Sequence, residues 1–174
     1  MSTTHKPSSS HPNDVKYGHL DYRPGVGIML FNHDGLVFVG ERMDHPGSWQ
    51  MPQGGIDEGE NIIEAALREM EEEVGTRHVS FLAEMAEWQY YELPERLILK
   101  LWDSKYRGQK QKWLAFRFDG TDDEIDIARH KPQEFMSWRW VAIERLLDLC
   151  VPFKRGVYEE AIRQFGHFSF PSDK

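Results

Sequence analysis

Acidic side chains are concentrated in one segment of this chain, residues 54–76, GGIDEGENIIEAALREMEEEVGT. It holds eight carboxylates and one base and so carries −7 of a net charge of −8. They are Asp57, Glu58, Glu60, Glu64, Glu69, Glu71, Glu72 and Glu73, with Arg68 as the base. Grouping like charges costs self-repulsion, whereas carboxylate oxygens suit a hard divalent cation such as Mg²⁺. The composition therefore points to a cation site.

The spacing within this segment predicts a helix. Asn61 is a suitable N-cap, and Gly75 is a suitable terminating residue. At about 100° per residue, Glu69, Glu72 and Glu73 share one face, while an apolar stripe occupies another. A run such as EMEEE is also typical of a solvated helix face, but the glycine-rich loop before it favours a site.

The pattern from Gly54 through Glu60 to Arg68–Gly75 resembles the Nudix box. This loop–helix–loop motif belongs to hydrolases that cleave nucleoside diphosphates linked to another moiety. The resemblance implies that Mg²⁺, or Mn²⁺ or another divalent cation, is held by five groups: the carboxylates of Glu69, Glu72, Glu73 and Glu134 and the carbonyl of Gly54.

Alternating and helical patterns surround the acidic helix. Strands are expected at residues 22–32, 36–42, 79–91, 97–102, 112–119 and 135–141, and helices at 143–149 and 154–168. We therefore predict an α/β fold, a Nudix-type α/β/α sandwich with a mixed β-sheet. Residues 21–170 are expected to form this single domain, and residues 1–20, rich in Ser, Thr, Pro, His and Asn, a flexible N-terminal tail.

The rest of the composition restricts the class of protein. The single cysteine, Cys150, excludes an intramolecular disulfide and suits a reducing compartment. The N-terminal residues lack the apolar stretch of a signal peptide, and no apolar run approaches membrane-spanning length. We expect a cytoplasmic enzyme that binds no membrane and has no stable protein partner.

A basic strip lies between residues 96 and 117, with seven bases and one acid. Trp102, Tyr106 and Trp113 are interleaved with the bases. Basic groups neutralise phosphates and aromatic faces stack on nucleobases, although a tryptophan in a strand, such as Trp113, is expected in the core. An acidic site and a basic strip in one small domain predict a metal-dependent enzyme with a polyphosphate substrate.

Further segments extend the resemblance over residues 22–165, including WQMPQGG, GQKQKW, WRW and FKR. Together they resemble the bacterial RNA 5′-pyrophosphohydrolases and the related diadenosine polyphosphate hydrolases. The resemblance implies that Arg23 and Lys112 lie near the 5′ phosphates. It also implies a base pocket formed by Arg42, Val151, Phe153 and Lys154. Simple packing is the alternative for Phe153, and Gln53, Gln109 and Lys110 complete the expected substrate contacts.

The expected reaction is Mg²⁺-dependent hydrolysis of the 5′-triphosphate end of RNA. Glu72 and Glu134 are the candidates for general base, and Arg68 is expected to orient the glutamates. Two alternatives are hydrolysis of dinucleoside tetraphosphates or other nucleoside polyphosphates, and a non-catalytic domain that binds nucleotide or RNA. The partners implied are 5′-triphosphorylated RNA or a dinucleoside polyphosphate.

Overall fold

The structure is a computed structural model that describes residues 11–172. Its centre is a mixed sheet in which β1 (Asp21–Phe31) pairs in parallel, along its whole length, with β7 (Tyr106–Phe118). The other strand pairs are antiparallel. They involve β2 (Val37–Arg42), β3 (Trp49–Gln50), β4 (Gln53–Gly55), β5 (Val79–Glu84), β6 (Gln89–Glu92) and β8 (Phe135–Val141).

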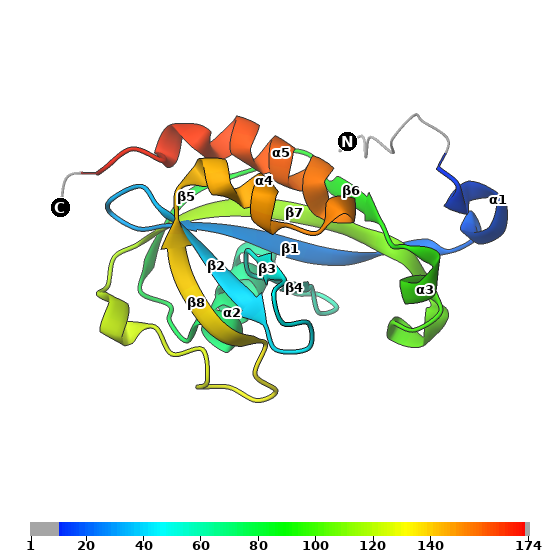
Figure 1. The fold of residues 1–174 in the computed structure, drawn as a ribbon, viewed down its shortest axis with the longest axis horizontal. Helices are drawn as coiled ribbons and strands as arrows, with labels where there is room; N and C mark the ends of the chain where they lie inside the picture. The colour runs from blue at the N-terminus through cyan, green and yellow to red at the C-terminus, as the bar shows by residue number, and fades with distance from the viewer. Residues whose placement is uncertain (1–10, 173–174) are drawn as a thin grey trace.

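Helices cover both faces of the sheet (Figure 1), as the predicted α/β/α sandwich requires. Helix α2 (Ile62–Val74) packs on one face against a core that includes Val26, Ile28 and Leu30. Helices α4 (Leu146–Leu149) and α5 (Arg155–Phe165) cover the other face, where Met29 and Phe31 belong to the second core. Successive side chains of β1 thus enter opposite cores, as the twofold period of a strand dictates.

The ends of α2 form as the sequence predicts. The side chain of Asn61 accepts hydrogen bonds from the backbone N–H groups of Ile63 and Glu64. Gly75 closes the helix at φ 86°, a left-handed conformation in which glycine avoids the steric penalty of a Cβ atom. This helix therefore holds its carboxylates on a rigid support.

The prediction of strands is confirmed for β1, β2 and β8 and is wrong for residues 97–102. Residues 97 and 98 belong to α3 (Glu95–Ile98), residues 99–101 follow this helix, and residue 102 begins the turn η1 (Trp102–Ser104). A short apolar run does not distinguish a strand from a helix, and Pro94 directly precedes this helix. The strand expected at residues 79–91 is divided into β5 and β6.

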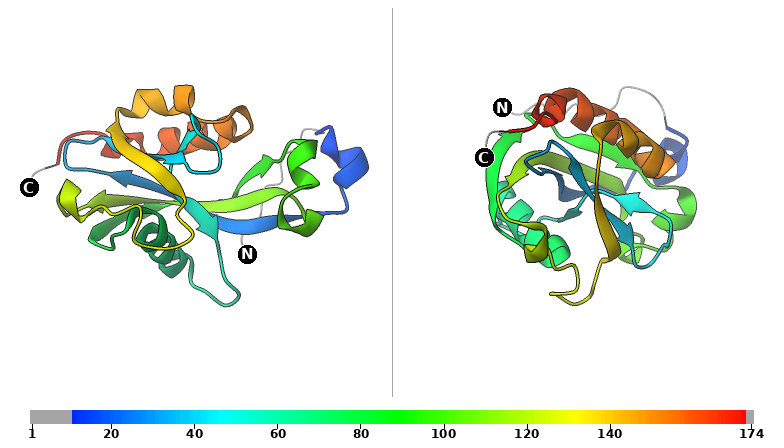
Figure 2. Two further views of the ribbon diagram at one scale, coloured as in Figure 1. Left: turned by 60° about the horizontal axis from the view of Figure 1, so that its bottom comes forward. Right: turned by 60° about the vertical axis from the view of Figure 1, so that its left-hand side comes forward.

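The segment that the sequence suggests is a tail contains a short helix. Residues 1–10 lie outside the described part of the chain, but α1 (Asn13–Tyr17) is helical and packs beside α3 (Figure 2). The Asn13 side chain donates to the carbonyl of Leu93 at 3.0 Å, and Tyr17 is buried in the core with its hydroxyl donating to Glu95. A helix this short depends on tertiary contacts for its stability. These contacts join residues about eighty positions apart, so the local composition does not predict the helix.

We expect Tyr17→Ala to lower the free energy of unfolding by about 3 kcal/mol, because it removes a buried aromatic ring. Val15→Ala on the same helix is the matched control, since Val15 is 98% exposed, and it should change stability by less than about 0.5 kcal/mol. Urea denaturation of both variants provides the measurement. Equal effects of the two substitutions would contradict the packing of α1 on the domain.

Candidate active site

A pocket of about 530 Å³ opens between α2, α3 and the turn before α5. It brings together eleven of the residues that the sequence singled out: Arg23, Arg42, Gln53, Gly54, Glu69, Glu73, Gln109, Glu134, Val151, Phe153 and Lys154. They come from β1, β2, β4, α2, β7, the loop before β8 and the segment before α5. Carboxylates, cations and aromatic groups distant in sequence thus share one site.

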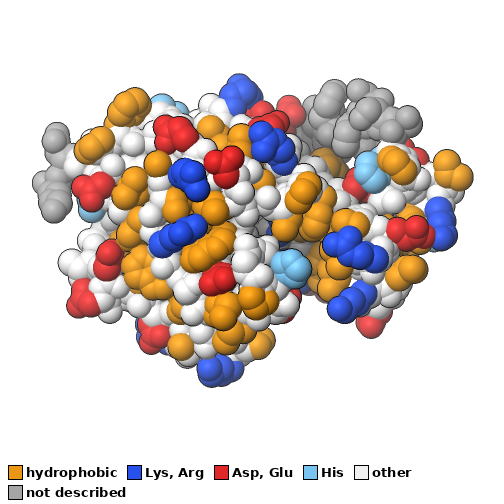
Figure 3. All heavy atoms as spheres, in the orientation of Figure 1, with side chains coloured by type: hydrophobic (Ala, Val, Ile, Leu, Met, Phe, Trp, Pro, Cys, Tyr) orange, Lys and Arg blue, Asp and Glu red, His pale blue; other side chains and the backbone are white. Residues whose placement is uncertain are grey.

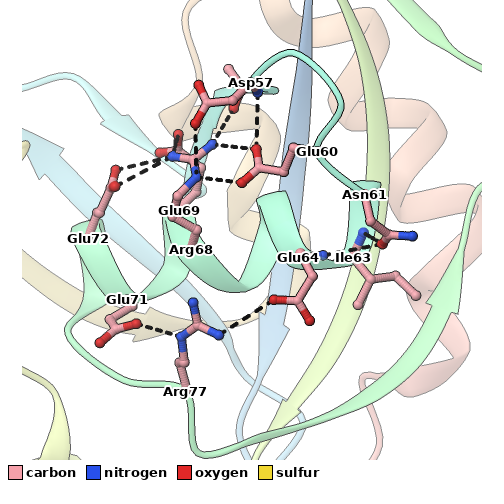
Figure 4. Close-up of polar contacts among 11 residues, drawn as sticks. Asp57, Glu60, Asn61, Ile63, Glu64, Arg68, Glu69, Glu71, Glu72 and Arg77 are labelled. Atoms are coloured by element: carbon pink, nitrogen blue, oxygen red, sulfur yellow. Dashed lines mark hydrogen bonds and ion pairs between the residues drawn. The ribbon is translucent and has the colours of Figure 1, made fainter.

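Arg68 connects the glycine-rich loop to the helix that follows it (Figure 4). Its guanidinium donates to Glu60 at 2.8 and 2.9 Å, to the carbonyl of Gly55 at 2.8 Å and to Glu69 at 2.8 Å. Glu72 lies farther away, at 3.5 Å from the same guanidinium. Hydrogen bonding to Arg68 lowers the pKa of Glu60 to about 2. Glu60 therefore stays ionised and holds Arg68 in place.

Glu69 and Glu73 are buried carboxylates on the inner face of α2. Burial raises the pKa of Glu69 to about 7, although its hydrogen bond with Arg68 opposes the shift. Burial also raises the pKa of Glu73, and the neighbouring Glu134 and Glu69 raise it further. The backbone N–H of Gln53 donates to Glu73 at 3.2 Å. Two desolvated acids and a third beside them form a site at which added positive charge is favourable.

Gly54 is required by the position of the Glu69 carboxylate. A Cβ atom on residue 54 would lie 1.9 Å from Cδ of Glu69 and 2.1 Å from one of its oxygens. A side chain there would push the carboxylate away from the loop. Because residue 54 is glycine, its backbone and the Glu69 carboxylate can lie close together.

The oxygen donors at this end of the pocket fit a divalent cation. Glu69, Glu73 and Glu134 supply hard ligands, and Oε1 of Gln53 is a buried oxygen without a hydrogen-bond partner. Within residues 11–172, no three Asp, Glu, His or Cys side chains already converge as a complete ligand set. Since Arg68 holds the Glu69 carboxylate, we expect that side chain to adjust when a cation binds.

The groups expected to contact a base also line this pocket. Arg42 forms a two-pronged ion pair with Asp44, at 2.9 and 2.7 Å. Lys154 is buried and donates to Gln50 at 3.0 Å, and burial together with the nearby Arg42 lowers its pKa to about 8. The Phe153 ring lies 5.7 Å from that of Tyr91. Phe153 both packs against the core and lines the pocket.

Four of the predicted residues do not line the pocket. Arg68 is enclosed by the loop it holds, and Glu72 is half-exposed beside it. Lys110 and Lys112 lie over the ring of Trp88 instead, and Lys112 donates to the carbonyl of Ala86 at 2.5 Å. The expected proximity of Lys112 to substrate therefore depends on movement of its side chain.

The basic strip does not form one surface. Arg107 is buried in ion pairs with Asp14 and Glu92, and Arg117 donates to the carbonyls of Asn32 and Phe168. Trp113 is fully buried, as expected of a strand residue. Along β7, Lys110 and Lys112 occupy positions that alternate with those of Trp113 and Arg117, so the bases of the strip point to opposite faces of the strand. Only the tertiary structure shows which of them are exposed to water.

Three lining residues belong to the predicted basic strip but were not assigned as individual substrate contacts. Trp102 stacks its ring against the Arg23 guanidinium, which lies 5.0 Å from the ring centroid. Arg96 and Lys100 line the same side of the pocket. Their basic character was visible in the sequence, but the strand expected at residues 97–102 obscured the helical face that they share.

Comparison with known proteins agrees with this geometry. Residues 21–161 match the NUDIX domain, and the chain belongs to the Nudix family. A protein of Rhodospirillum rubrum named RNA pyrophosphohydrolase is 54% identical over 152 residues, which is 87% of this chain and 92% of the relative. One of the same name from Novosphingobium aromaticivorans is 53% identical over 157 residues, covering 88% and 97% of the two chains.

Solved structures with the same fold are more distant in sequence. The E. coli dihydroneopterin triphosphate pyrophosphohydrolase aligns with a TM-score of 0.63 at 18% identity, over 83% of this chain and 99% of that one. A C. elegans Ap4A hydrolase binary complex aligns with a TM-score of 0.59 at 18% identity, over 83% and 96%. These similarities confirm the predicted α/β Nudix fold.

We expect Gly54→Ala to weaken divalent-cation binding by about 10–100-fold, because the added methyl group displaces the Glu69 carboxylate. The control is Gly156→Ala in α5, where an added Cβ atom meets no neighbour and alanine favours the helix. Calorimetric titration with Mg²⁺ or Mn²⁺ measures both proteins. Unchanged affinity in the Gly54 variant would show that Glu69 does not depend on this close approach.

The raised pKa of Glu69 predicts a pH dependence of stability in metal-free protein. Between pH 4.5 and about 7, the folded protein retains a proton on Glu69 that the unfolded chain releases, so stability falls as pH rises through this window. Glu69→Gln should reduce the fall by about 3 kcal/mol at most, and Glu64→Gln on the exposed part of α2 should leave it unchanged. Urea denaturation across this pH range tests the assignment, which an unaltered slope in Glu69→Gln would refute.

Proposed function

We propose that this protein hydrolyses the 5′-triphosphate end of RNA in the cytoplasm. The reaction depends on Mg²⁺ or another divalent cation and releases pyrophosphate or phosphate to leave a 5′-monophosphate. The observation that carries the proposal is a pocket whose lining combines the carboxylates of Glu69, Glu73 and Glu134 with three cations, Arg23, Arg42 and Lys154. Carboxylates recruit the cation, and the bases and aromatic rings accommodate phosphates and a nucleobase. Relatives about half identical in sequence carry the name RNA pyrophosphohydrolase.

Each group has a defined task in the proposed reaction. Glu69, Glu72, Glu73, Glu134 and the carbonyl of Gly54 would hold divalent cations, which supply charge neutralisation and a bound water of lowered pKa. Arg23, stacked on Trp102, orients the 5′ phosphates. Arg68 keeps Glu69 and Glu72 in position through its fixed fork to Glu60.

The proton of the attacking water passes to a carboxylate. We assign this role to either Glu134, which lines the pocket, or Glu72, which is half-exposed on α2 beside Arg68. Val151, Phe153 and Lys154 form the wall that receives a base near the RNA end.

No helix in the described residues has both the length and the apolar character to cross a membrane.

Parallel assays on 5′-triphosphorylated RNA and a dinucleoside tetraphosphate, in one buffer with one cation, test the proposal. We expect a larger kcat/KM for the RNA. Glu72→Gln and Glu73→Gln should each lower kcat by about 10²–10⁴-fold while leaving the circular dichroism spectrum intact, and Glu64→Gln is the control.

Three results would count against this assignment. A larger kcat/KM for the dinucleoside tetraphosphate would show that small nucleotides, and not RNA ends, are the preferred substrate. Full activity of the Glu72 and Glu73 variants would remove both residues from the site. Binding of nucleotide or RNA without hydrolysis would identify a non-catalytic domain.

A further inference from the structure

One side of the pocket is formed by residues 95–102, here called the α3 wall. Arg96, Leu97, Lys100, Leu101 and Trp102 from this segment line the pocket. Helical hydrogen bonds continue beyond α3, from Leu99 N–H to the Glu95 carbonyl at 3.2 Å and from Leu101 N–H to the Leu97 carbonyl at 2.9 Å. The wall therefore presents a regular helical face to the pocket.

The α3 wall is held from outside by the N-terminal helix. Glu95 accepts hydrogen bonds from Lys16 and from the Tyr17 hydroxyl, both in α1. The buried guanidinium of Arg107 joins α1 to β6 through ion pairs with Asp14 and Glu92. Figure 2 shows α1 and α3 together on the arm formed by the ends of β1 and β7. The α3 wall is thus a supported element of the fold.

The wall ends in an unusual backbone conformation. Trp102, Asp103 and Ser104 have φ of 49°, 56° and 58°, a left-handed region that bulky residues rarely adopt. Such conformations persist where the surrounding structure enforces them, and they cluster at functional sites. Here the turn aims the Trp102 ring at the Arg23 guanidinium inside the pocket.

Arg96 and Lys100 differ from the other cations of the pocket. Arg42 is paired with Asp44, Lys154 donates to Gln50, and Arg23 stacks on Trp102. Across residues 11–172, the side chains of Arg96 and Lys100 form no ion pair, hydrogen bond or ring contact, and both residues are exposed. Lys and Arg side chains are visible on the part of the surface near α3 (Figure 3). These two cations remain available for an anionic ligand.

Their spacing places both cations on the same face of the wall. Arg96 and Lys100 are four residues apart and lie on one helical face, separated by about 6 Å along the axis. They line the pocket from a different element than the carboxylates of α2, and exposed Lys and Arg side chains neutralise the phosphates of a nucleic-acid backbone.

We propose that Arg96 and Lys100 bind phosphodiester groups of the RNA strand downstream of its 5′ end. This inference rests on the proposed function, because it assigns a second contact region for the same substrate. The terminal phosphates occupy the carboxylate end of the pocket, and the following backbone runs along the α3 wall. These contacts distinguish an RNA from a small nucleotide, which has no phosphodiester backbone.

The test uses Arg96→Gln, Lys100→Gln and the double variant in the full-length protein. KM for 5′-triphosphorylated RNA should rise about threefold in each single variant and about tenfold in the double, with kcat within twofold. The logarithmic salt dependence of RNA affinity should weaken by about 0.7 for each lost contact. Lys105→Gln removes the same charge from an exposed residue outside the pocket and should change neither quantity.

Two equilibrium binding measurements separate this inference from the proposed function. Fluorescence anisotropy records the affinity of each variant for a 5′-monophosphorylated RNA and for a dinucleoside tetraphosphate, so that it does not depend on turnover. A selective loss of RNA affinity supports the α3 wall as a backbone site even if hydrolysis of RNA is absent. Equal losses for both ligands, or no loss for RNA, would overturn the inference.

Discussion

The site depends on the contact between the Glu69 carboxylate and the backbone of Gly54. This contact exists because residue 54 has no side chain and because Arg68 draws the carboxylate toward the loop. Arg68 is in turn fixed by two hydrogen bonds to Glu60 and one to the Gly55 carbonyl. A single guanidinium therefore joins the loop, the start of the helix and the acidic face into one unit.

This arrangement places negative charge where desolvation opposes it. Burial raises the pKa of both Glu69 and Glu73, and Glu134 adds to the repulsion at Glu73. Metal-free protein thus carries an electrostatic cost that a divalent cation would relieve. The same pocket also contains cations whose positions are held by neighbouring groups, such as Arg42 by Asp44 and Lys154 by Gln50.

The arm formed by the ends of β1 and β7 carries the segment that lines a second side of the pocket, the α3 wall. Its helices α1 and α3 are too short to be stable alone. They are held by contacts with each other, and α1 also contacts β6 while α3 contacts β7. The α3 wall places exposed cations beside a pocket whose other bases are already engaged. Recognition of substrate is therefore built on a different part of the fold from the acidic helix.

Local patterns in the sequence determined the central features of this protein. Asn61 and Gly75 define the ends of α2, alternation defines β1 and β8, and the spacing of Glu69, Glu72 and Glu73 defines one acidic face, since each depends on neighbouring residues. The Nudix fold followed from the same motif.

Tertiary structure alone decided which charges meet. It buried Arg107 between Asp14 and Glu92, directed Lys112 toward the Ala86 carbonyl and converted the expected strand at residues 97–102 into the α3 wall. Tertiary contacts also stabilise helix α1 within the segment that the sequence suggested was a tail. These outcomes rest on contacts between segments far apart in the chain, whose energies local periodicity does not encode.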